Sequence, residues 1–421
     1  MHTPTLLLTA YAVDPYKGSE NGMGWQFIRQ AAKGYRVIAI TRENNLPAIE
    51  RYLREHDVPE AAHIQWVGYD LPRWARWWKR GNIGAMPYYV LWQRTLPAFI
   101  RRQRWSFDLV HNLNFHNDWS PTWLWQLGKP LVWGPIGHHP LIPTPFLRPV
   151  YGWKPWLADR GRWLVKQLFW RSPALRRSAQ RADLVLAMNH SVAPVLPAQP
   201  RWLEVFPSAG SMSPGPLATK TANERFEVLS VGRFVPLKGF DITVRSFAAF
   251  RAALPEAERA RVRLTLIGKG PSQPLLERLG QELGLGESLR FISWIPHQEL
   301  LNLYREADLF FFPSHEGAGM VVPEALSYGL PVLSLDNCGP GEFITPTCGR
   351  SVPYGPYDET VAAFAARLSE LYSDPALRET LSAGARDRFD QWFDWDTKGA
   401  LLRQWYHSLL PVEEPLFSIP N

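Results

Sequence analysis

Two series of short, β-rich apolar runs alternate with helical patterns along this chain of 421 residues, and this alternation limits the folds open to it. Strands separated by crossover helices are the units of a parallel sheet. The expected strands of the first series are Thr5–Tyr11, Tyr35–Thr41, Leu109–Leu113, Pro130–Trp133 and Asp183–Met188. Those of the second series are Phe226–Val231, Arg263–Ile267, Leu289–Trp294, Asp308–Phe312 and Pro331–Leu335. The sequence therefore predicts an α/β protein with two doubly wound, Rossmann-like domains that face each other across a cleft.

A segment rich in small residues and proline separates the two series and is typical of a linker. The chain is also longer than the ~250–300 residues at which a single core stops growing. We expect an N-terminal domain over 1–207, a linker over 208–223, a C-terminal domain over 224–385 and a final helical segment over 386–421. Ligands of doubly wound domains bind beyond the carboxyl ends of the strands, so the cleft is the expected site.

The composition excludes several classes of protein. Hydrophobic residues make up 46% and charged residues 20%, which is ordinary for a globular protein and argues against disorder or a fibrous repeat. Two cysteines, Cys338 and Cys348, are too few for a disulfide scaffold or a four-cysteine zinc site. No apolar stretch approaches the ~20 residues that cross a bilayer, and the opening run Leu6–Val13 fits a buried strand better than a signal sequence. We therefore expect a cytoplasmic protein.

Two loops of the second series carry cations beside glycines. The first reads GRFVPLKGFD and contains Arg233 and Lys238. Fixed cations at the carboxyl end of a strand suit a diphosphate, because they neutralise charge that grows on a leaving group. The second, IGKGP, contains Gly268 and Lys269, and its glycines allow the backbone to approach a phosphate closely. Together the loops predict a phosphate site; solvated surface loops are the alternative interpretation.

A glycine-containing loop between two glutamates, HEGAGMVVPEAL, follows the buried strand DLFFFPS. Glu316 therefore lies at the carboxyl edge of the sheet. The residues Gly319, Met320 and Val321 then offer backbone N–H groups at the start of the next helix, where anions bind. Glu324, in the first turn of that helix, is suited to accept hydrogen bonds from a diol such as a ribose. For Glu324 alone, the alternative is an acid that stabilises the helix dipole.

These ordered motifs resemble those of the family 4 glycosyltransferases, also known as glycosyl transferases group 1. The matching segments are GRFVPLKG, LIGKGP, FISWIP, DLFFFPSHEGAGMVVPEALSYGLPVL, the CGPGEFI turn before Gly349, and FDWD near the C-terminus. Members are enzymes of the hexosyltransferase type with the GT-B fold, and they transfer a sugar from a nucleotide-diphosphate donor with retention at the anomeric carbon. The resemblance implies this fold and activity here, with a final helix that crosses back to the first domain.

The resemblance also implies roles for single residues. The implied donor contacts are Arg233 and Lys238 to the diphosphate, Glu316 to the transferred sugar, Glu324 to the ribose, Gly319–Val321 through backbone N–H groups, and Ser293–Ile295, with Trp294, beside the base. The implied donor is UDP- or GDP-linked. The implied acceptor is a glycan or lipid-linked hydroxyl, as in the synthesis of surface polysaccharides or glycolipids.

The first half matches the family less closely. GSENGMGWQF lies where relatives carry a glycine loop that faces the diphosphate and the acceptor, and its candidate residues are Gly18, Ser19, Glu20 and Gly22. Relatives also place a sugar-contacting histidine after the strand that here reads PLVWGPIGHHP. The aligned position here is Ile136 or Gly137, and His138 and His139 follow it directly. His111 and His116, in HNLNFHND, are rivals at the end of another strand, and we rank His138 and His116 equally.

The implied mechanism is direct delivery of the acceptor hydroxyl to the face that the leaving group vacates, through an oxocarbenium-like transition state. Double displacement would need a carboxylate beside the anomeric carbon, and in the family the glutamate matched by Glu316 contacts sugar hydroxyls instead. We expect no covalent intermediate, no cofactor and no metal. Asp394 and Asp396 flank a tryptophan in the sequence D-W-D, and two acids at this spacing chelate a metal in other glycosyltransferases. Here they begin a helical segment, where acids stabilise the helix N-terminus, so we assign them a structural role.

The formal charge of +7 is concentrated in two segments of the first half. Leu71–Arg104 and Arg148–Arg181 each carry a net charge of +8, so the rest of the chain is net −9. Tryptophans lie among these cations: Trp74, Trp77, Trp78 and Trp92 in the first segment, and Trp153, Trp156, Trp163 and Trp170 in the second. Such segments favour peripheral contact with the anionic inner face of the cell membrane. No nucleic-acid motif accompanies them, and the alternative is core tryptophans with solvating arginines.

Two further functional classes stay open. A GT-B sugar-nucleotide epimerase or an inverting transferase would share the fold, although the Glu316 and Glu324 pair favours retention. A non-catalytic carbohydrate-binding protein would explain the tryptophan-rich first half, but it would not need Arg233 and Lys238. The base, the sugar, the acceptor and the oligomeric state are not determined by the sequence.

Overall fold

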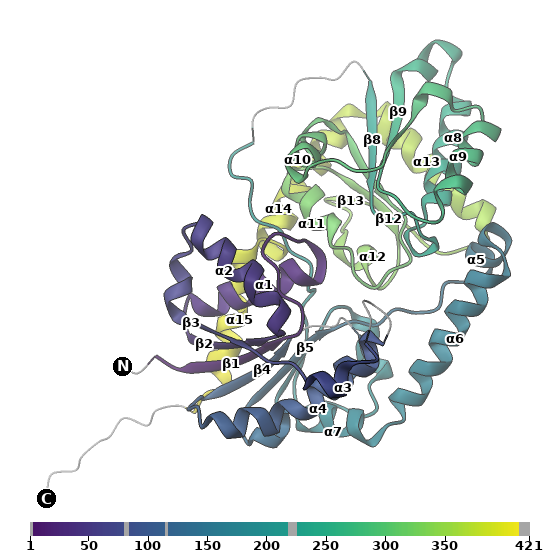
Figure 1. The fold of residues 1–421 in the computed structure, drawn as a ribbon. Coiled ribbons are helices and arrows are strands. Elements are labelled where there is room, and N and C mark those ends of the chain that lie inside the picture. The colour runs from purple at the N-terminus through teal and green to yellow at the C-terminus, as the bar shows by residue number, and fades with distance from the viewer. Residues whose placement is uncertain (1–2, 80–83, 114–116, 218–224, 412–421) are drawn as a thin grey trace, which may run out of the picture.

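The computed structural model describes residues 3–79, 84–113, 117–217 and 225–411, and it contains two parallel sheets in separate domains, one above the other in Figure 1. The seven strands of the first sheet are in the order β3-β2-β1-β4-β5-β6-β7. They are β1 (Thr5–Ala10), β2 (Arg36–Thr41), β3 (Ile64–Gly68), β4 (Leu109–Leu113), β5 (Leu131–Ile136), β6 (Leu184–Ala187) and β7 (Leu203–Val205). The strand order reverses at β1, which pairs with both β2 and β4.

Helices cover both faces of the first sheet, so its central strands are buried on both sides and are apolar almost throughout. The helices of this domain are α1 (Ser19–Ala32), α2 (Leu46–Glu55), α3 (Arg73–Arg76), α4 (Ala85–Gln103), α5 (Thr144–Tyr151), α6 (Trp153–Trp170) and α7 (Pro173–Arg181). One face packs against α1, and the other against α4 and α7.

The second sheet has six parallel strands in the order β10-β9-β8-β11-β12-β13. They are β8 (Phe226–Val231), β9 (Val262–Ile267), β10 (Leu289–Ile292), β11 (Leu309–Phe312), β12 (Val332–Leu335) and β13 (Gly349–Val352). Its helices are α8 (Phe240–Ala253), α9 (Gln273–Glu282), α10 (His297–Glu306), α11 (Val321–Ser327), α12 (Pro340–Phe343), α13 (Tyr357–Ser373) and α14 (Pro375–Trp392). The two doubly wound α/β domains predicted from the sequence are therefore confirmed.

The predicted strands agree with the observed ones, with ends that differ by at most three residues. Three strands were not predicted: β3, β7 and β13. All three lie at sheet edges and are partly exposed, so their sequences lack the continuous apolar run that marks a central strand. Residues 218–223 of the expected linker lie outside the described residues.

Two helical segments join the domains. The last helix, α15 (Trp395–Leu409), follows α14 and packs on α1 of the first domain, where Trp395, Leu402 and Tyr406 enter its core (Figure 1). In the other direction, α5 packs against the second domain, and Phe146 and Leu147 join the apolar cluster that contains Phe240. The Tyr151 hydroxyl donates to Asp241 Oδ1 of α8 over 2.6 Å. Both connections hold the carboxyl edges of the two sheets toward each other.

Candidate functional site

The loops that follow β8, β9 and β11 meet at the carboxyl edge of the second sheet, because these strands are parallel neighbours. The first two loops are joined through their backbones: Phe234 N–H donates to Lys269 O over 3.1 Å, and Ser272 N–H donates to Phe234 O over 2.9 Å. Gly268 has a φ of +144°, and a Cβ at this position would lie 1.9 Å from Gly232 O. Only glycine permits this close approach.

The cations of these two loops differ in their surroundings. The side chains of Arg233 and Lys269 are exposed and make no hydrogen bond or ion pair within the described part of the chain. Lys238 ends a 3-10 turn (Pro236–Lys238) and is largely buried, with its Nζ 4.9 Å from the ring centroid of Phe312. Of the three predicted phosphate-binding cations, Arg233 and Lys269 therefore face solvent, whereas Lys238 is held in place by its neighbours.

Lys238 and Glu316 form an ion pair, which the sequence did not predict. Lys238 Nζ lies 2.6 Å from Glu316 Oε1, and Glu316 is only 9% exposed. The backbone N–H of Glu316 also donates to Ser314 Oγ over 3.3 Å. A carboxylate and an ammonium group are thus fixed side by side at the edge of the sheet, and each neutralises the other when no further charged group is bound.

Glu324 lies in the first turn of α11, as predicted, and is partly buried. The hydroxyl of Tyr304, from α10, donates to Glu324 Oε2 over 3.3 Å. Burial raises the pKa of the Glu324 carboxyl to about 7, although the hydrogen bond from Tyr304 acts in the opposite direction. This carboxyl therefore changes its charge near neutral pH.

The other predicted donor residues border the same edge. Gly319 and Met320 directly precede α11, and Val321 is its first residue, so their N–H groups belong to a turn in which intrahelical acceptors are lacking. Met320 packs against apolar clusters of both domains. Trp294, two residues beyond β10, is 72% exposed and so offers a free aromatic face.

The Glu316 loop contacts the first domain directly. Asn189 Nδ2 donates to Gly317 O over 2.8 Å and to His138 O over 3.1 Å. Gly317 N–H donates to His139 Nδ1 over 2.9 Å. A Cβ on Gly317 would lie 1.9 Å from His138 O, so this contact is possible only for glycine. The GHHP segment after β5 and the Glu316 loop therefore form one interdomain site.

His138 is paired with Asp118 inside this site. His138 Nδ1 lies 2.6 Å from Asp118 Oδ2, and both side chains are buried. Rings of Trp163 and Trp170, on α6, flank the imidazole with centroid distances of 5.8 and 5.6 Å. His138 Nε2 makes no hydrogen bond with the described residues. A carboxylate on Nδ1 fixes the orientation of the ring and leaves Nε2 available.

The rival histidines have other surroundings. His116 lies outside the described residues. His111 is fully buried: its Nδ1 lies 2.6 Å from the hydroxyl of Tyr406, and its Nε2 lies 2.7 Å from Gly134 O. Burial lowers the pKa of His111 to about 4, although the bond to the Gly134 carbonyl acts in the opposite direction. His111 thus joins α15 to the first sheet, and both of its ring nitrogens are occupied.

The predicted N-terminal loop leads into α1. Ser19 is the first helical residue and has a φ of +55°, an uncommon value for a residue other than glycine. A Cβ on Gly22 would lie 2.5 Å from Lys17 O, so glycine is required at this turn. Gly18 and Ser19 are exposed and Glu20 is partly buried.

Three side chains of the site were not predicted from the sequence: Asp118, Asn189 and Tyr304. His139 was noted beside His138, but its contact with the Glu316 loop was not predicted. In the HNLNFHND segment, the described residue that reaches His138 is the final acid, Asp118. Asn189 and Tyr304 carry no local signal, because their partners lie far away in the sequence.

Asp394 and Asp396 have structural partners. Asp394 caps α15 by accepting from the N–H groups of Asp396 and Thr397, at 2.9 and 3.1 Å. Asp396 Oδ1 accepts from Gln30 Nε2 over 2.7 Å and from Lys33 Nζ over 2.5 Å. Among the described residues, no group of three or more His, Cys, Asp or Glu side chains could hold a metal ion. The structural role predicted for Asp394 is confirmed.

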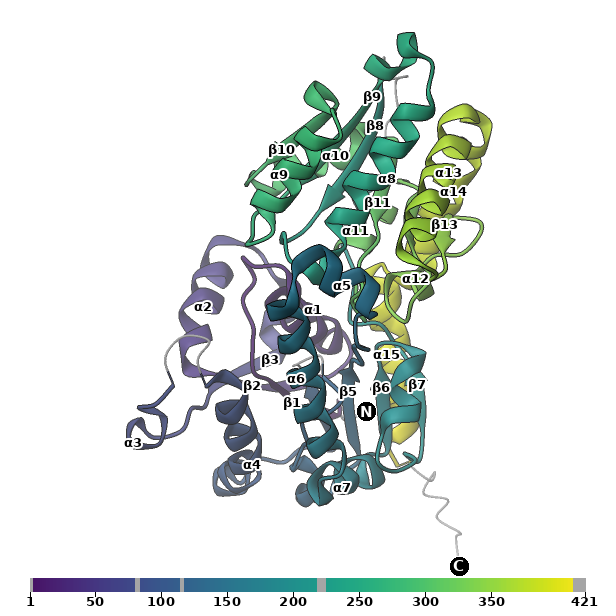
Figure 2. The same cartoon turned by 90° about the vertical axis from the view of Figure 1, so that its right-hand side faces the viewer.

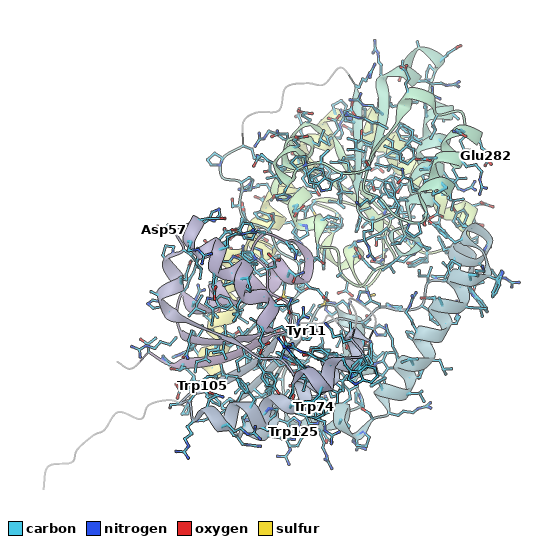
Figure 3. The ribbon with its side chains drawn as sticks, in the orientation of Figure 1. Tyr11, Asp57, Trp74, Trp105, Trp125 and Glu282 are labelled. Carbon is cyan, nitrogen blue, oxygen red and sulfur yellow. The ribbon has the colours of Figure 1, made fainter. Side chains whose placement is uncertain are left out.

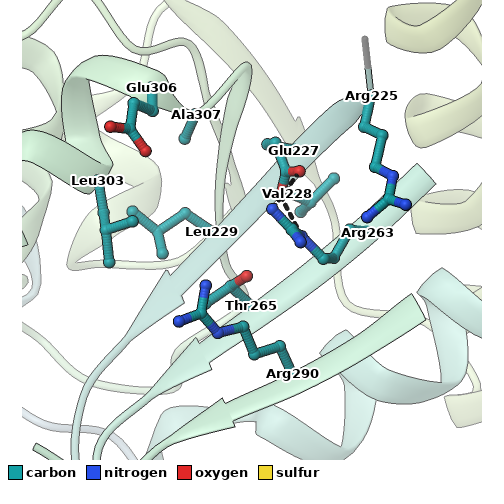
Figure 4. Close-up of a pocket in the computed structure, with 10 residues that line it drawn as sticks. All are labelled: Arg225, Glu227, Val228, Leu229, Arg263, Thr265, Arg290, Leu303, Glu306 and Ala307. Atoms are coloured by element: carbon teal, nitrogen blue, oxygen red, sulfur yellow. Dashed lines mark hydrogen bonds and ion pairs between the residues drawn. The ribbon is translucent and has the colours of Figure 1, made fainter. Parts of the chain in front are cut away.

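A hollow of about 390 Å³ lies elsewhere on the second domain (Figure 4). It is lined near the amino ends of β8, β9 and β10, and within it Arg263 pairs with Glu227 at 2.7 Å. The loops described above follow the opposite ends of these strands. The hollow therefore does not belong to the interdomain site.

Residues 218–388 match the family model described as glycosyl transferases group 1. A GDP-mannose-dependent alpha-(1-6)-phosphatidylinositol monomannoside mannosyltransferase of Mycolicibacterium smegmatis is 29% identical over 207 residues, 46% of this chain and 52% of that protein. A lipopolysaccharide core biosynthesis glycosyltransferase of Rhizobium meliloti is 33% identical over 184 residues, 41% of this chain and 48% of that one. The chain thus matches about half the length of these curated relatives.

Solved structures resemble the whole chain. Sucrose-phosphate synthase from Thermosynechococcus elongatus has a TM-score of 0.64 at 22% identity, with 96% of this chain and 99% of that chain covered. Anabaena HepE in complex with UDP has a TM-score of 0.61 at 18% identity, with 96% and 100% covered. This likeness confirms the predicted GT-B fold.

Proposed function

We propose, from the premise that the C-terminal domain of this chain belongs to the glycosyl transferases group 1 family, that the protein transfers a sugar from a nucleotide-diphosphate donor to an acceptor hydroxyl. The observation that carries this proposal is the convergence of Lys238, Glu316 and Glu324 at one sheet edge, against a histidine-containing segment of the other domain. The acceptor we propose is a glycan or a lipid-linked glycan of glycolipid or surface polysaccharide synthesis. Two relatives support it: one is named a phosphatidylinositol monomannoside mannosyltransferase and the other a lipopolysaccharide core biosynthesis glycosyltransferase.

The donor binds the second domain in this proposal. Arg233 and Lys269 are exposed cations that would reach the diphosphate, and Lys238 would do so from its site beside Glu316. The N–H groups at the start of α11 would donate to the same phosphates. The carboxylate of Glu324 would accept from the ribose hydroxyls, and the exposed ring of Trp294 would stack on the base.

The transferred sugar would lie between Glu316 and the first domain. Glu316 would accept hydrogen bonds from sugar hydroxyls, and His138 Nε2 would contact the sugar from the opposite side. Asp118 then acts as a positioning residue, because it holds the other ring nitrogen of His138 at 2.6 Å. The loop of Gly18, Ser19, Glu20 and Gly22 would close the acceptor side of the site.

Retention by front-face delivery is the stereochemical outcome that we propose. The acceptor hydroxyl would approach the face from which the diphosphate leaves, and the growing negative charge would be stabilised by Lys238 and Arg233. An inverting transferase is the second candidate, because the Asp118–His138 pair also has the geometry of a general base. The anomeric configuration of the transferred sugar, read from the proton coupling constant in the product, distinguishes the two.

Hydrolysis of the donor without an acceptor tests the proposed class of enzyme. Purified protein should release nucleotide from a UDP- or GDP-linked sugar, and release should persist in excess EDTA, because side-chain cations replace a metal at the leaving group. Activity that is lost in EDTA and restored by manganese would contradict the metal-independent site. A protein that gives neither release nor a thermal shift with any nucleotide-sugar would contradict the proposed activity and favour carbohydrate binding alone.

Glu324 should make donor binding depend on pH. The carboxylate is the better acceptor for a ribose diol, and its pKa of about 7 leaves most molecules protonated at pH 6. Affinity for a nucleotide-sugar should therefore rise about tenfold from pH 6 to pH 8. Isothermal titration should show this rise in the wild type and not in Glu324→Gln. A nucleotide-sugar is the proper probe because its diphosphate does not titrate in this range. If the affinity of the wild type and that of Glu324→Gln changed with pH in the same way, Glu324 would be excluded as the ribose contact.

We also propose a cytoplasmic location with peripheral contact at the inner membrane face. The basic segments 71–104 and 148–181 support it, although not through all of their tryptophans. Trp92 and Trp170 are buried in the core, so for them the membrane interpretation was wrong, whereas Trp74, Trp77 and Trp153 are at least 60% exposed. Figure 3 shows Trp74 on α3, at the front of the first domain. No helix within the described ranges combines the length and the apolar character needed to cross a bilayer.

A further inference from the structure

Helix α6 carries a stripe of large apolar side chains that face solvent. Its members are Trp153, Leu157, Leu164, Val165 and Leu168, each between 46% and 65% exposed. Their spacing places them on one side of the helix. Figure 2 shows α6 at the front of the molecule, where it runs from α5, beside the second domain, down over the first domain. Arg160 and Gly161 interrupt the stripe between Leu157 and Leu164. Isolated exposed leucines are normal, but five exposed apolar side chains on one side of a single helix mark an interaction surface.

The opposite face of α6 is firmly packed and supports the candidate site. Trp163 and Trp170 pack against the core of the first domain and flank the ring of His138. Lys166 Nζ donates to His139 O over 3.0 Å. The inner face of α6 therefore holds the two histidines that meet the Glu316 loop, and the orientation of the helix is fixed by these contacts. The stripe is outward-facing in the folded protein.

Cations border the stripe. Lys154, Arg162 and Arg171 are exposed, and the segment 148–181 has a net charge of +8. The one acid of this segment, Asp159, is already paired with Arg160 at 2.8 Å and with Arg162 at 3.7 Å. An apolar stripe between basic flanks is the pattern of a helix that lies in the surface of an anionic bilayer. Two copies of the chain joined through α6 would bring these cations against one another, which disfavours a dimer.

We propose that α6 binds an anionic lipid bilayer by inserting its apolar stripe, and that it thereby holds the candidate site at the lipid surface. This inference rests on the proposed function, since it assigns the acceptor to a lipid-linked class. A helix with its side chains is about 10–12 Å thick. His138 therefore lies about one helix diameter from the bilayer, within reach of the headgroup sugar of a lipid acceptor.

Co-sedimentation with vesicles tests the proposal. The wild-type protein should bind vesicles that contain phosphatidylglycerol and phosphatidylcholine, bind pure phosphatidylcholine weakly, and bind less as salt is raised. The double variant Leu164→Gln/Leu168→Gln should bind the anionic vesicles at least about tenfold more weakly, because it no longer inserts these two leucine side chains into the bilayer. The matched control, Leu283→Gln/Trp392→Gln, removes two exposed apolar side chains from the second domain and should bind as the wild type does.

Two measurements separate this proposal from its alternatives. Release of nucleotide from a donor in solution should be the same in Leu164→Gln/Leu168→Gln and the wild type, so a loss of vesicle binding with intact release supports docking through α6. Equal vesicle binding by the variant and the wild type would overturn the proposal and leave the proposed function intact. A dimer in sedimentation equilibrium that the same variant dissociates would also overturn it and assign the stripe to a second copy.

Discussion

Glu316→Gln should lower the turnover number about 10²–10³-fold while leaving nucleotide affinity unchanged or slightly higher. Removal of one oriented polar contact to a developing charge typically has an effect of this size. Affinity should not fall, because the substitution removes a negative charge beside the diphosphate and frees Lys238 from its 2.6 Å ion pair. Steady-state kinetics with a nucleotide-sugar donor and titration with the free nucleotide measure the two quantities separately.

The neighbouring acid provides a matched control for this prediction. Glu324→Gln makes the same chemical change one helical turn into α11, and it should weaken nucleotide binding with a smaller effect on turnover. Parallel losses of affinity and turnover in Glu316→Gln would instead mean that Glu316 serves mainly to position Lys238. The double variant with Lys238→Met decides this point: if positioning is the whole role, the double variant should be no worse than Lys238→Met alone.

The central strands were predictable because a strand that is buried on both faces of a parallel sheet is apolar at nearly every position. The segment LLLTA of β1 and the segment LFFF of β11 are buried throughout, and such short, bounded apolar runs are typical of strands covered on both faces. The edge strand β3 reads IQWVG, with one face partly open to water, and it resembles a loop in composition. Prediction from pattern thus works where burial is complete and fails at the edges, where tertiary pairing decides the conformation.

The candidate site was predictable where its chemistry is contiguous in the chain. Glu316, the glycines after it and Glu324 occupy one strand–loop–helix unit, so local sequence gives their order in space. The pairs that complete the site are not local: Lys238 and Glu316 are 78 residues apart, and Asn189 and Gly317 are 128 apart. The pairing of β11 with β8 brings the first pair together, and the packing of one domain against the other brings the second pair together. No periodicity in the sequence records either contact.

Gly317→Ala is the second substitution for which we expect a large loss of activity. It changes the contact between the two domains without removing a charged group. The new Cβ would lie 1.9 Å from His138 O and 2.9 Å from Asn189 Nδ2. The first of these is a backbone atom of the other domain, so relief requires the GHHP segment and the Glu316 loop to separate. That movement would break the bonds from Asn189 to Gly317 O and from Gly317 N–H to His139.

We therefore expect Gly317→Ala to lower turnover at least about 100-fold, since misplacement of reacting groups by about 1 Å has effects of this size. The free energy of unfolding should fall by about 1–3 kcal/mol, as is typical of an overpacked contact. Gly161→Ala is the control, because a Cβ at this helical position meets no atom within 4 Å and should leave turnover unchanged. Full activity in Gly317→Ala would mean that the domains work apart, and that the His138 segment does not contact the sugar while Glu316 holds it.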